Sequence, residues 1–371
     1  MIQKGVSYLQ DQPGTMPHAG EKPPYISCLL ACVALLYVTH LSLFPLLDLP
    51  GLFVLTVFCA LYALLLATND VRFTPVPPVV CAISLLARAF FADGFTLNTV
   101  QSFTNLIFAL LTGLALYVCL RQGSTKSVAF AVLCAAYTLF LASHVVFLLI
   151  QLYGAFNLEV LEKGVNDLAA YVGKFYSAIL ENTSSQGTLT ARSAQSAETI
   201  QAMKDFEPTL VVSVRLSLPS FAVCFSMIAA ALTLLFYKPT AHALHAEKKL
   251  AFAGNERFSL SSGSVVMFYV SYGIYLITSF TASDSALFVA FMNLSAILTY
   301  PFAWIGIRFL YTFLCKKLKS RAGSIALLAV AFPLLGMLLG LGGLIFTFLA
   351  FVGASSQLSA NLRNKLSGGD I

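Results

Sequence analysis

The chain of 371 residues is long enough for two soluble domains, but 58% of its residues are apolar and only 10% are charged. Its mean hydropathy of +0.83 is typical of an integral membrane protein and excludes an ordinary soluble fold. The net charge of +6 is better explained by membrane topology than by nucleic-acid binding.

The amino-terminal part begins with a polar, proline-rich stretch over residues 1–25, which lacks the charged n-region and cleavage site of a signal peptide. We interpret it as a cytoplasmic tail. Five apolar runs follow, at 26–44, 51–67, 76–92, 98–120 and 127–153. Each approaches or exceeds the about 20 residues that a membrane-spanning helix needs, so residues 26–153 predict a five-span bundle.

Residues 154–208 form the one sizeable segment that we expect outside the membrane. Apolar residues recur there every three or four positions, at Leu158, Leu161, Val165, Leu168, Val172, Phe175 and Ile179. This spacing predicts an amphipathic helix, which Ser, Gly and Thr residues then break at 183–190. A second, shorter helix is expected from Ile200 to just before Pro208. We expect a helical hairpin that caps the outer face; contact with a partner or with the membrane surface is the alternative.

The carboxyl-terminal spans are expected within residues 209–358. Apolar runs lie at 209–236, 263–281, 286–314 and about 324–358. The last run would be roughly 52 Å long as one helix, too long for a core of about 30 Å. Pro333 and Gly340 therefore indicate either one kinked helix or a hairpin of two short ones, and we favour the hairpin. The predicted fold is an all-α polytopic bundle of about nine spans, within a range of eight to ten, followed by a basic tail at 359–371.

The distribution of lysine and arginine sets the expected orientation. If the amino terminus lies inside, only four basic residues of the connecting segments lie outside, at Lys163, Lys174, Arg192 and Lys204. The inner segments then hold the basic clusters, including the one at 316–321. We expect a cytoplasmic amino terminus in a bacterial inner membrane.

The carboxyl half carries its features in a recognisable order. A span ends in the basic loop LLFYKPTAHALHAEKKL, and FMNLSAILTYPFAWIGIRFLYTFLCKKLK and a glycine-rich run closing with NLRNKL follow. In this order, and in Asn293, Gly306, Arg363 and Lys365, the chain resembles the YybS-like family of uncharacterised bacterial membrane proteins. Ile305 departs from that family, which often has Gln there. The first 150 residues are similar in span order to the substrate-binding S components of energy-coupling-factor transporters, a likeness of layout alone.

No sequence motif predicts catalysis. The chain lacks a nucleotide-binding loop of the GxxxxGK[ST] type and an HExxH motif. Its eight cysteines form no CxxC pair, and His242 and His245 have no carboxylate at ligand spacing. We therefore expect no enzymatic activity, no catalytic residue, no cofactor and no metal.

Six polar side chains from six spans are expected at one depth in the outer half of the membrane: Arg88, Arg215, His40, His144, Asn105 and Asn293. Polar groups in hydrocarbon are costly and mark candidate functional sites. Together they predict an outward-facing pocket with two fixed positive charges, suited to a carboxylate or a phosphate. The alternative is that each has a structural role. Arg88 would then reach toward Asp93, Arg215 would reach toward the region of Glu207, and the others would bond neighbouring helices.

Two functions of different classes fit these features. The first is a bacterial inner-membrane protein that binds or transports a small, anionic molecule from the outer face without an ATPase of its own. Its partners would be the lipid bilayer and an energising ATPase module, with no nucleic acid. The alternative is a non-transport assembly or regulatory partner of cell-envelope proteins, with the outer hairpin as its contact surface. All sixteen acidic residues lie in loops, in tails or at span ends, which argues against a proton-coupled carrier.

Overall fold

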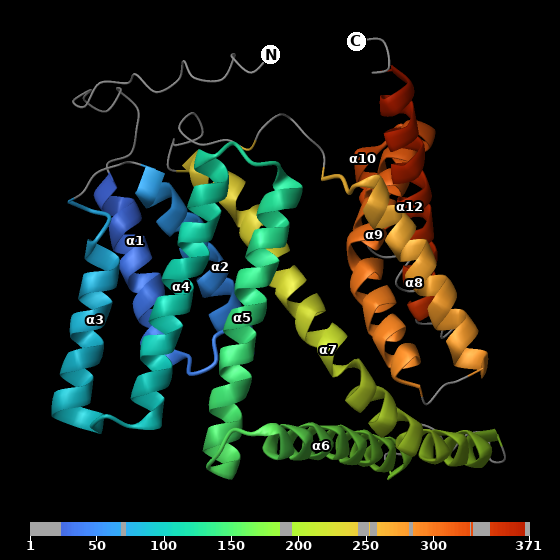
Figure 1. The fold of residues 1–371 in the computed structure, drawn as a ribbon, viewed down its shortest axis with the longest axis horizontal. Coiled ribbons are helices and arrows are strands. Elements are labelled where there is room, and N and C mark those ends of the chain that lie inside the picture. Colours follow the sequence, from blue (N-terminus) through green and yellow to red (C-terminus); the bar gives the residue numbers. More distant parts are fainter. Residues whose placement is uncertain are drawn as a thin grey trace. The chain divides into compact units, whose positions relative to one another are not determined.

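Every regular element in the described part of the computed structural model is helical (Figure 1). The structure describes residues 24–67, 72–185, 195–243, 252, 258–281, 285–326, 328 and 342–367. Seven helices among them are long and apolar enough to cross a membrane: Leu49–Ala67, Leu97–Arg121, Lys126–Tyr153, Val211–Ala243, Ser262–Thr281, Ala286–Leu318 and Gly343–Leu362. Two shorter apolar helices, Tyr25–Leu41 and Val76–Ala92, correspond to the first and third predicted spans. The predicted all-α multi-pass bundle is confirmed, whereas most of the predicted amino-terminal tail lies outside the described residues.

The chain folds as two compact units. Unit 1 comprises residues 1–124 and 231–253, and unit 2 comprises residues 125–230 and 254–371. One long helix, α7 (Gln195–Ala243), contributes to both. Each unit has its own buried side chains.

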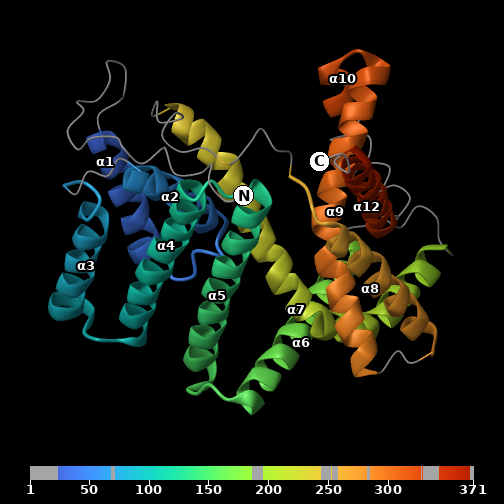
Figure 2. The same cartoon turned by 45° about the horizontal axis from the view of Figure 1, so that its top comes forward.

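Four helices of unit 1 lie side by side (Figures 1 and 2), and the end of α7 also belongs to this unit. They are α1 (Pro24–Leu36) with the π-helical turn η1 (Tyr37–Leu41), α2 (Leu49–Ala67), α3 (Val76–Arg88) with the π-helical turn η2 (Ala89–Asp93), and α4 (Leu97–Arg121). In the chain α2 follows α1 and precedes α3, and it runs in the opposite direction to both, so η1 and η2 lie at the same end of the unit (Figure 1). The first turns of α4 lie there too, since α4 follows η2 directly.

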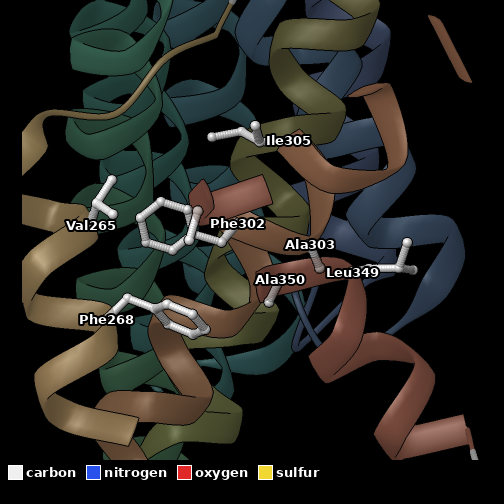
Figure 3. Packing of buried hydrophobic residues seen from close by; sticks show 8 residues of the cluster. Val265, Phe268, Phe302, Ala303, Ile305, Leu349 and Ala350 are labelled. Carbon is white, nitrogen blue, oxygen red and sulfur yellow. The ribbon is translucent and has the colours of Figure 1, made fainter. Parts of the chain in front are cut away.

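Unit 2 is built from α5 (Lys126–Tyr153), α6 (Leu158–Ser185), the first part of α7, α8 (Ser262–Thr281), α9 (Ala286–Leu318), α10 (Arg321–Ala326) and α12 (Gly342–Ser367). Its core forms where three of these helices meet. Figure 3 shows the buried side chains of Val265 and Phe268 from α8, Phe302, Ala303 and Ile305 from α9, and Leu349 and Ala350 from α12. The rings of Phe268 and Phe302 are 5.0 Å apart between centroids. Dense aromatic packing therefore joins α8 to α9.

Two glycines bring the backbones of α9 and α12 into direct contact. A Cβ atom on Gly306 would overlap the carbonyl oxygen of Leu349, and one on Gly353 would overlap the carbonyl oxygen of Phe302. Close approach through small residues is a common way for helices to associate in membranes, where apolar side chains gain nothing by leaving lipid. Gly306 and Gly353 are therefore required by the crossing itself.

The predicted end of a helix before Pro208 is wrong. The second helix of the expected hairpin and the expected sixth span are one continuous helix, α7, which passes through Pro208 and ends at Ala243. A proline inside a helix costs roughly 3 kcal/mol. Proline is nevertheless tolerated inside the helices of membrane proteins where other groups satisfy the freed backbone carbonyl. The first helix of the hairpin is confirmed as α6.

The predicted choice between a kink and a hairpin in the run at 324–358 falls mostly outside the described residues. α10 ends at Ala326 and α12 begins at Gly342, and only residue 328 is described between them. α12 continues to Ser367, so the first residues of the expected basic tail are helical.

We predict that Gly306→Ala and Gly353→Ala each destabilise the protein by about 1 to 3 kcal/mol, because the added methyl group must force α9 and α12 apart. The measurement is the unfolding midpoint in a mixed-detergent titration. Gly273→Ala in α8 is the matched control, since its Cβ atom would meet no atom within 4 Å. Equal midpoints for all three variants would show that the crossing is not tight.

Candidate functional site

The η1 and η2 end of unit 1 holds a set of buried polar side chains in an otherwise apolar bundle. Gln101 and Asn105, on the first turns of α4, are fully buried, and Ser42, which follows η1, is also buried. His40 in η1 and Arg88 at the end of α3 are half-buried. The two π-helical turns that close α1 and α3 both end here.

Asn105 ties the segment after η1 to α4. Its amide nitrogen donates to the carbonyl oxygens of Leu43 at 3.0 Å and Ser42 at 3.4 Å. Its own carbonyl oxygen accepts from the amide of Gln101 at 2.9 Å. Because both protons of the Asn105 amide are used inside the protein, this residue positions the site. These bonds agree with the structural alternative for Asn105, in which its side chain bonds to a neighbouring part of the bundle.

Three buried atoms beside this network make no hydrogen bond to any described residue. They are Nε2 of His40, Oγ of Ser42 and Oε1 of Gln101. Leaving a buried polar atom unpaired costs about 1 to 3 kcal/mol, so such atoms in a folded protein call for a partner from outside the chain. The positive charge of Arg88 lies close enough to the His40 imidazole to act on it. This end of unit 1 therefore combines a positive charge with unfilled hydrogen-bonding capacity.

Asn293, in unit 2, has a different role. Its side-chain oxygen accepts from the backbone N–H of Ser220 at 2.9 Å, and its amide nitrogen donates to the carbonyl oxygen of Leu216 at 2.9 Å. In an uninterrupted α-helix that N–H and that carbonyl would bond to each other. Pro219 lies between them, has no N–H to donate and crowds the preceding turn. The carboxamide of Asn293 thus bridges α7 beside its proline, as a peptide group would.

Both amide protons of Asn293 are occupied, because the second donates to the carbonyl oxygen of Val289 at 2.8 Å. This leaves no donor for a ligand. The structural alternative for Asn293 accounts for its geometry, and we do not include it in the candidate site.

Arg215 forms an ion pair with Glu162 of α6 at 3.4 Å, and both side chains are exposed. The structural alternative predicts a partner for Arg215 near Glu207, whose side chain lies outside the described residues. The side chain of Asp93, the partner predicted for Arg88, lies outside them too. An exposed pair of this kind is worth about 0 to 1 kcal/mol.

His144 is fully buried in α5 and packs on the ring of Phe140, and the centroids of the two rings are 4.6 Å apart.

The six predicted site residues thus divide between the two units. His40, Arg88 and Asn105 belong to unit 1 and lie at one end of it. Arg215, His144 and Asn293 belong to unit 2, where Arg215 and Asn293 contact different partners. We place the candidate site at the unit 1 residues, which lie together.

Two residues of the candidate site were missed by the sequence analysis. Gln101 precedes Asn105 by four positions in an apolar span, which places both amides on one helix face, so this spacing could have revealed Gln101. Ser42 carries no such signal, because only the fold brings its segment to α4.

A groove of about 560 Å³ lies elsewhere in unit 1, between α1, α2 and the end of α7. Its lining is almost wholly apolar, including Leu30, Phe53, Leu61 and Phe236, and none of the candidate residues line it. Tyr37 and Thr240 are the polar side chains in this lining, and no charged residue lines it.

These features define a multi-pass α-helical membrane protein with a polar cluster at one end of its first unit. Residues 41–345 match the model of a family described as predicted membrane proteins (DUF2232), and the chain belongs to this family. No curated protein and no solved structure shows significant similarity to the chain.

We predict that Asn293→Ala lowers the unfolding free energy by about 1 to 3 kcal/mol, because Ser220 N–H and Leu216 C=O lose a buried partner beside Pro219. The test is the unfolding midpoint in detergent, compared with Asn166→Ala, which removes an exposed amide from α6. If the two variants unfold alike, the bridge across α7 contributes nothing.

Proposed function

We propose that this protein binds a small anionic molecule at the η1 and η2 end of unit 1, as a transporter or as a transport-associated binding component without an ATPase of its own. The observation that carries the proposal is the group of three unpaired buried atoms, on His40, Ser42 and Gln101, beside the charge of Arg88. In a protein of this hydropathy, such a group costs stability unless something fills it.

The chemistry of the unpaired atoms narrows the ligand class. Oε1 of Gln101 can only accept a hydrogen bond, so the ligand must carry a donor such as a hydroxyl or an amino group. Arg88 donates hydrogen bonds and carries a fixed charge, which favours a carboxylate or a phosphate on the same molecule. Oγ of Ser42 and Nε2 of His40 can serve as donors or acceptors. A small hydroxy acid, amino acid or phosphorylated alcohol meets these demands.

The wider setting comes from resemblance and from charge distribution. The first 150 residues are similar in span order to S components of energy-coupling-factor transporters, which capture a substrate and rely on a separate ATPase. Likeness to the YybS-like family and the basic segments favour a bacterial inner membrane with a cytoplasmic amino terminus. In that orientation the η1 and η2 end faces outward. We propose a binding role and no enzymatic activity.

We predict that Arg88→Ala weakens binding of the stabilising anion by about tenfold or more, which corresponds to about 1.4 kcal/mol. The measurement is the thermal unfolding midpoint of the purified protein with a panel of hydroxy acids, amino acids and phosphorylated alcohols. Arg215→Ala is the matched control, because its charge lies on an exposed surface of unit 2.

Each compound is tested beside its analogue without the hydroxyl or amino group. We expect the analogue to bind more weakly, because Oε1 of Gln101 would stay buried without a donor. The proposal is wrong if no anion of the panel stabilises the protein, or if Arg88→Ala responds as the wild type does.

A further inference from the structure

We propose that α6 lies in the interface of the bilayer, with one face among the lipid head groups and the upper acyl chains. The occupant of this face is thus lipid, and the helix lies along the membrane surface. This inference concerns unit 2 alone and does not depend on the ligand site of unit 1.

The first argument is where α6 begins. α5 has 28 residues and is therefore about 42 Å long, which exceeds the hydrocarbon core of about 30 Å and brings its end to the head-group layer. The chain then turns at Gly154, whose backbone is left-handed with φ of 74°. Asn157 caps α6 by accepting from the N–H of Val160 at 2.8 Å. Only residues 154–157 separate the two helices, so α6 starts at the membrane boundary.

The second argument is a set of contacts between the end of α5 and the first turns of α6, which fix the direction of α6. The hydroxyl of Tyr153 donates to Asp167 at 2.6 Å, and the ammonium of Lys163 lies 5.1 Å from the centre of the Tyr153 ring. Gly164 packs against Leu149, where a Cβ atom would be only 2.5 Å from a methyl carbon. These contacts hold α6 across the end of α5, as Figure 1 shows for the two helices. α6 therefore runs along the boundary where α5 ends.

The third argument is the face that α6 leaves open. Leu158, Leu168, Tyr171 and Phe175 expose between 45% and 81% of their surface. Along a helix they fall on one side together with the predicted apolar seam, whereas Glu159, Lys163, Asn166, Asp167 and Lys174 fall on the other. An exposed aromatic and aliphatic face beside a membrane span is the signature of an interfacial helix.

The charged residues of α6 indicate whether electrostatic attraction or apolar burial holds it on lipid. Its described side chains include three acidic residues, Glu159, Glu162 and Asp167, and two basic ones, Lys163 and Lys174. A helix with so little positive charge gains nothing from anionic lipids and is held by apolar burial. Membrane contact of α6 should therefore be the same in zwitterionic and anionic vesicles.

The test uses tryptophan fluorescence in vesicles of phosphatidylcholine brominated on the acyl chain close to the head group. Trp304 is the one native tryptophan, so Trp304→Phe gives a silent background. We predict that Leu168→Trp and Phe175→Trp lose about half of their fluorescence relative to unbrominated vesicles, because this face is buried by about 5 to 10 Å. Asn166→Trp and Lys174→Trp on the polar face are the matched controls and should lose little.

Tyr171→Trp is a third reporter of the apolar face, in case one of the other variants folds poorly. Added anionic lipid or salt should leave the quenching unchanged. The proposal is overturned if the apolar-face tryptophans are as little quenched as the controls, which would mean that water, a second copy or another protein covers this face. Equal, strong quenching on both faces would also overturn it, since α6 would then be immersed in the bilayer.

Discussion

A chain in hydrocarbon must satisfy its backbone hydrogen bonds from within, and this constraint governs the structure. It explains why the described elements are helices. Where a proline interrupts the backbone hydrogen bonds of a helix, a side chain replaces them. The carboxamide of Asn293 bonds to the backbone on both sides of Pro219. Asn105 does the same for the carbonyl groups after η1. Two buried asparagines thus act as substitutes for peptide groups.

Because of the same constraint, a buried polar atom without a hydrogen-bond partner indicates a candidate binding site. Asn105 and Asn293 have both amide protons paired inside the protein, whereas Oε1 of Gln101 has no partner in the described chain although its amide nitrogen is bonded. A side chain that was only structural would be expected to use both ends. The difference between these amides is what separates the candidate site from the supporting network.

The helices and their approximate ends were predictable from the sequence, because apolar run length is a direct consequence of membrane thickness. The continuity of α7 was not, since proline often ends a helix but is also tolerated inside the helices of membrane proteins. Asn293 was identified as an unusual polar residue, but its partner at Ser220 is 73 positions away, and no local pattern reveals such a contact. For the same reason the α9 and α12 crossing at Gly306 and Gly353 requires the fold.

The most direct measurement of the central claim is a cryo-electron microscopy map of the protein in lipid nanodiscs, at a resolution that shows ordered water. We expect density larger than a water molecule at the η1 and η2 end of unit 1, in contact with Oε1 of Gln101 and Oγ of Ser42 and within reach of Arg88. A site that holds only water, or side chains that turn to pair with one another, would contradict the account.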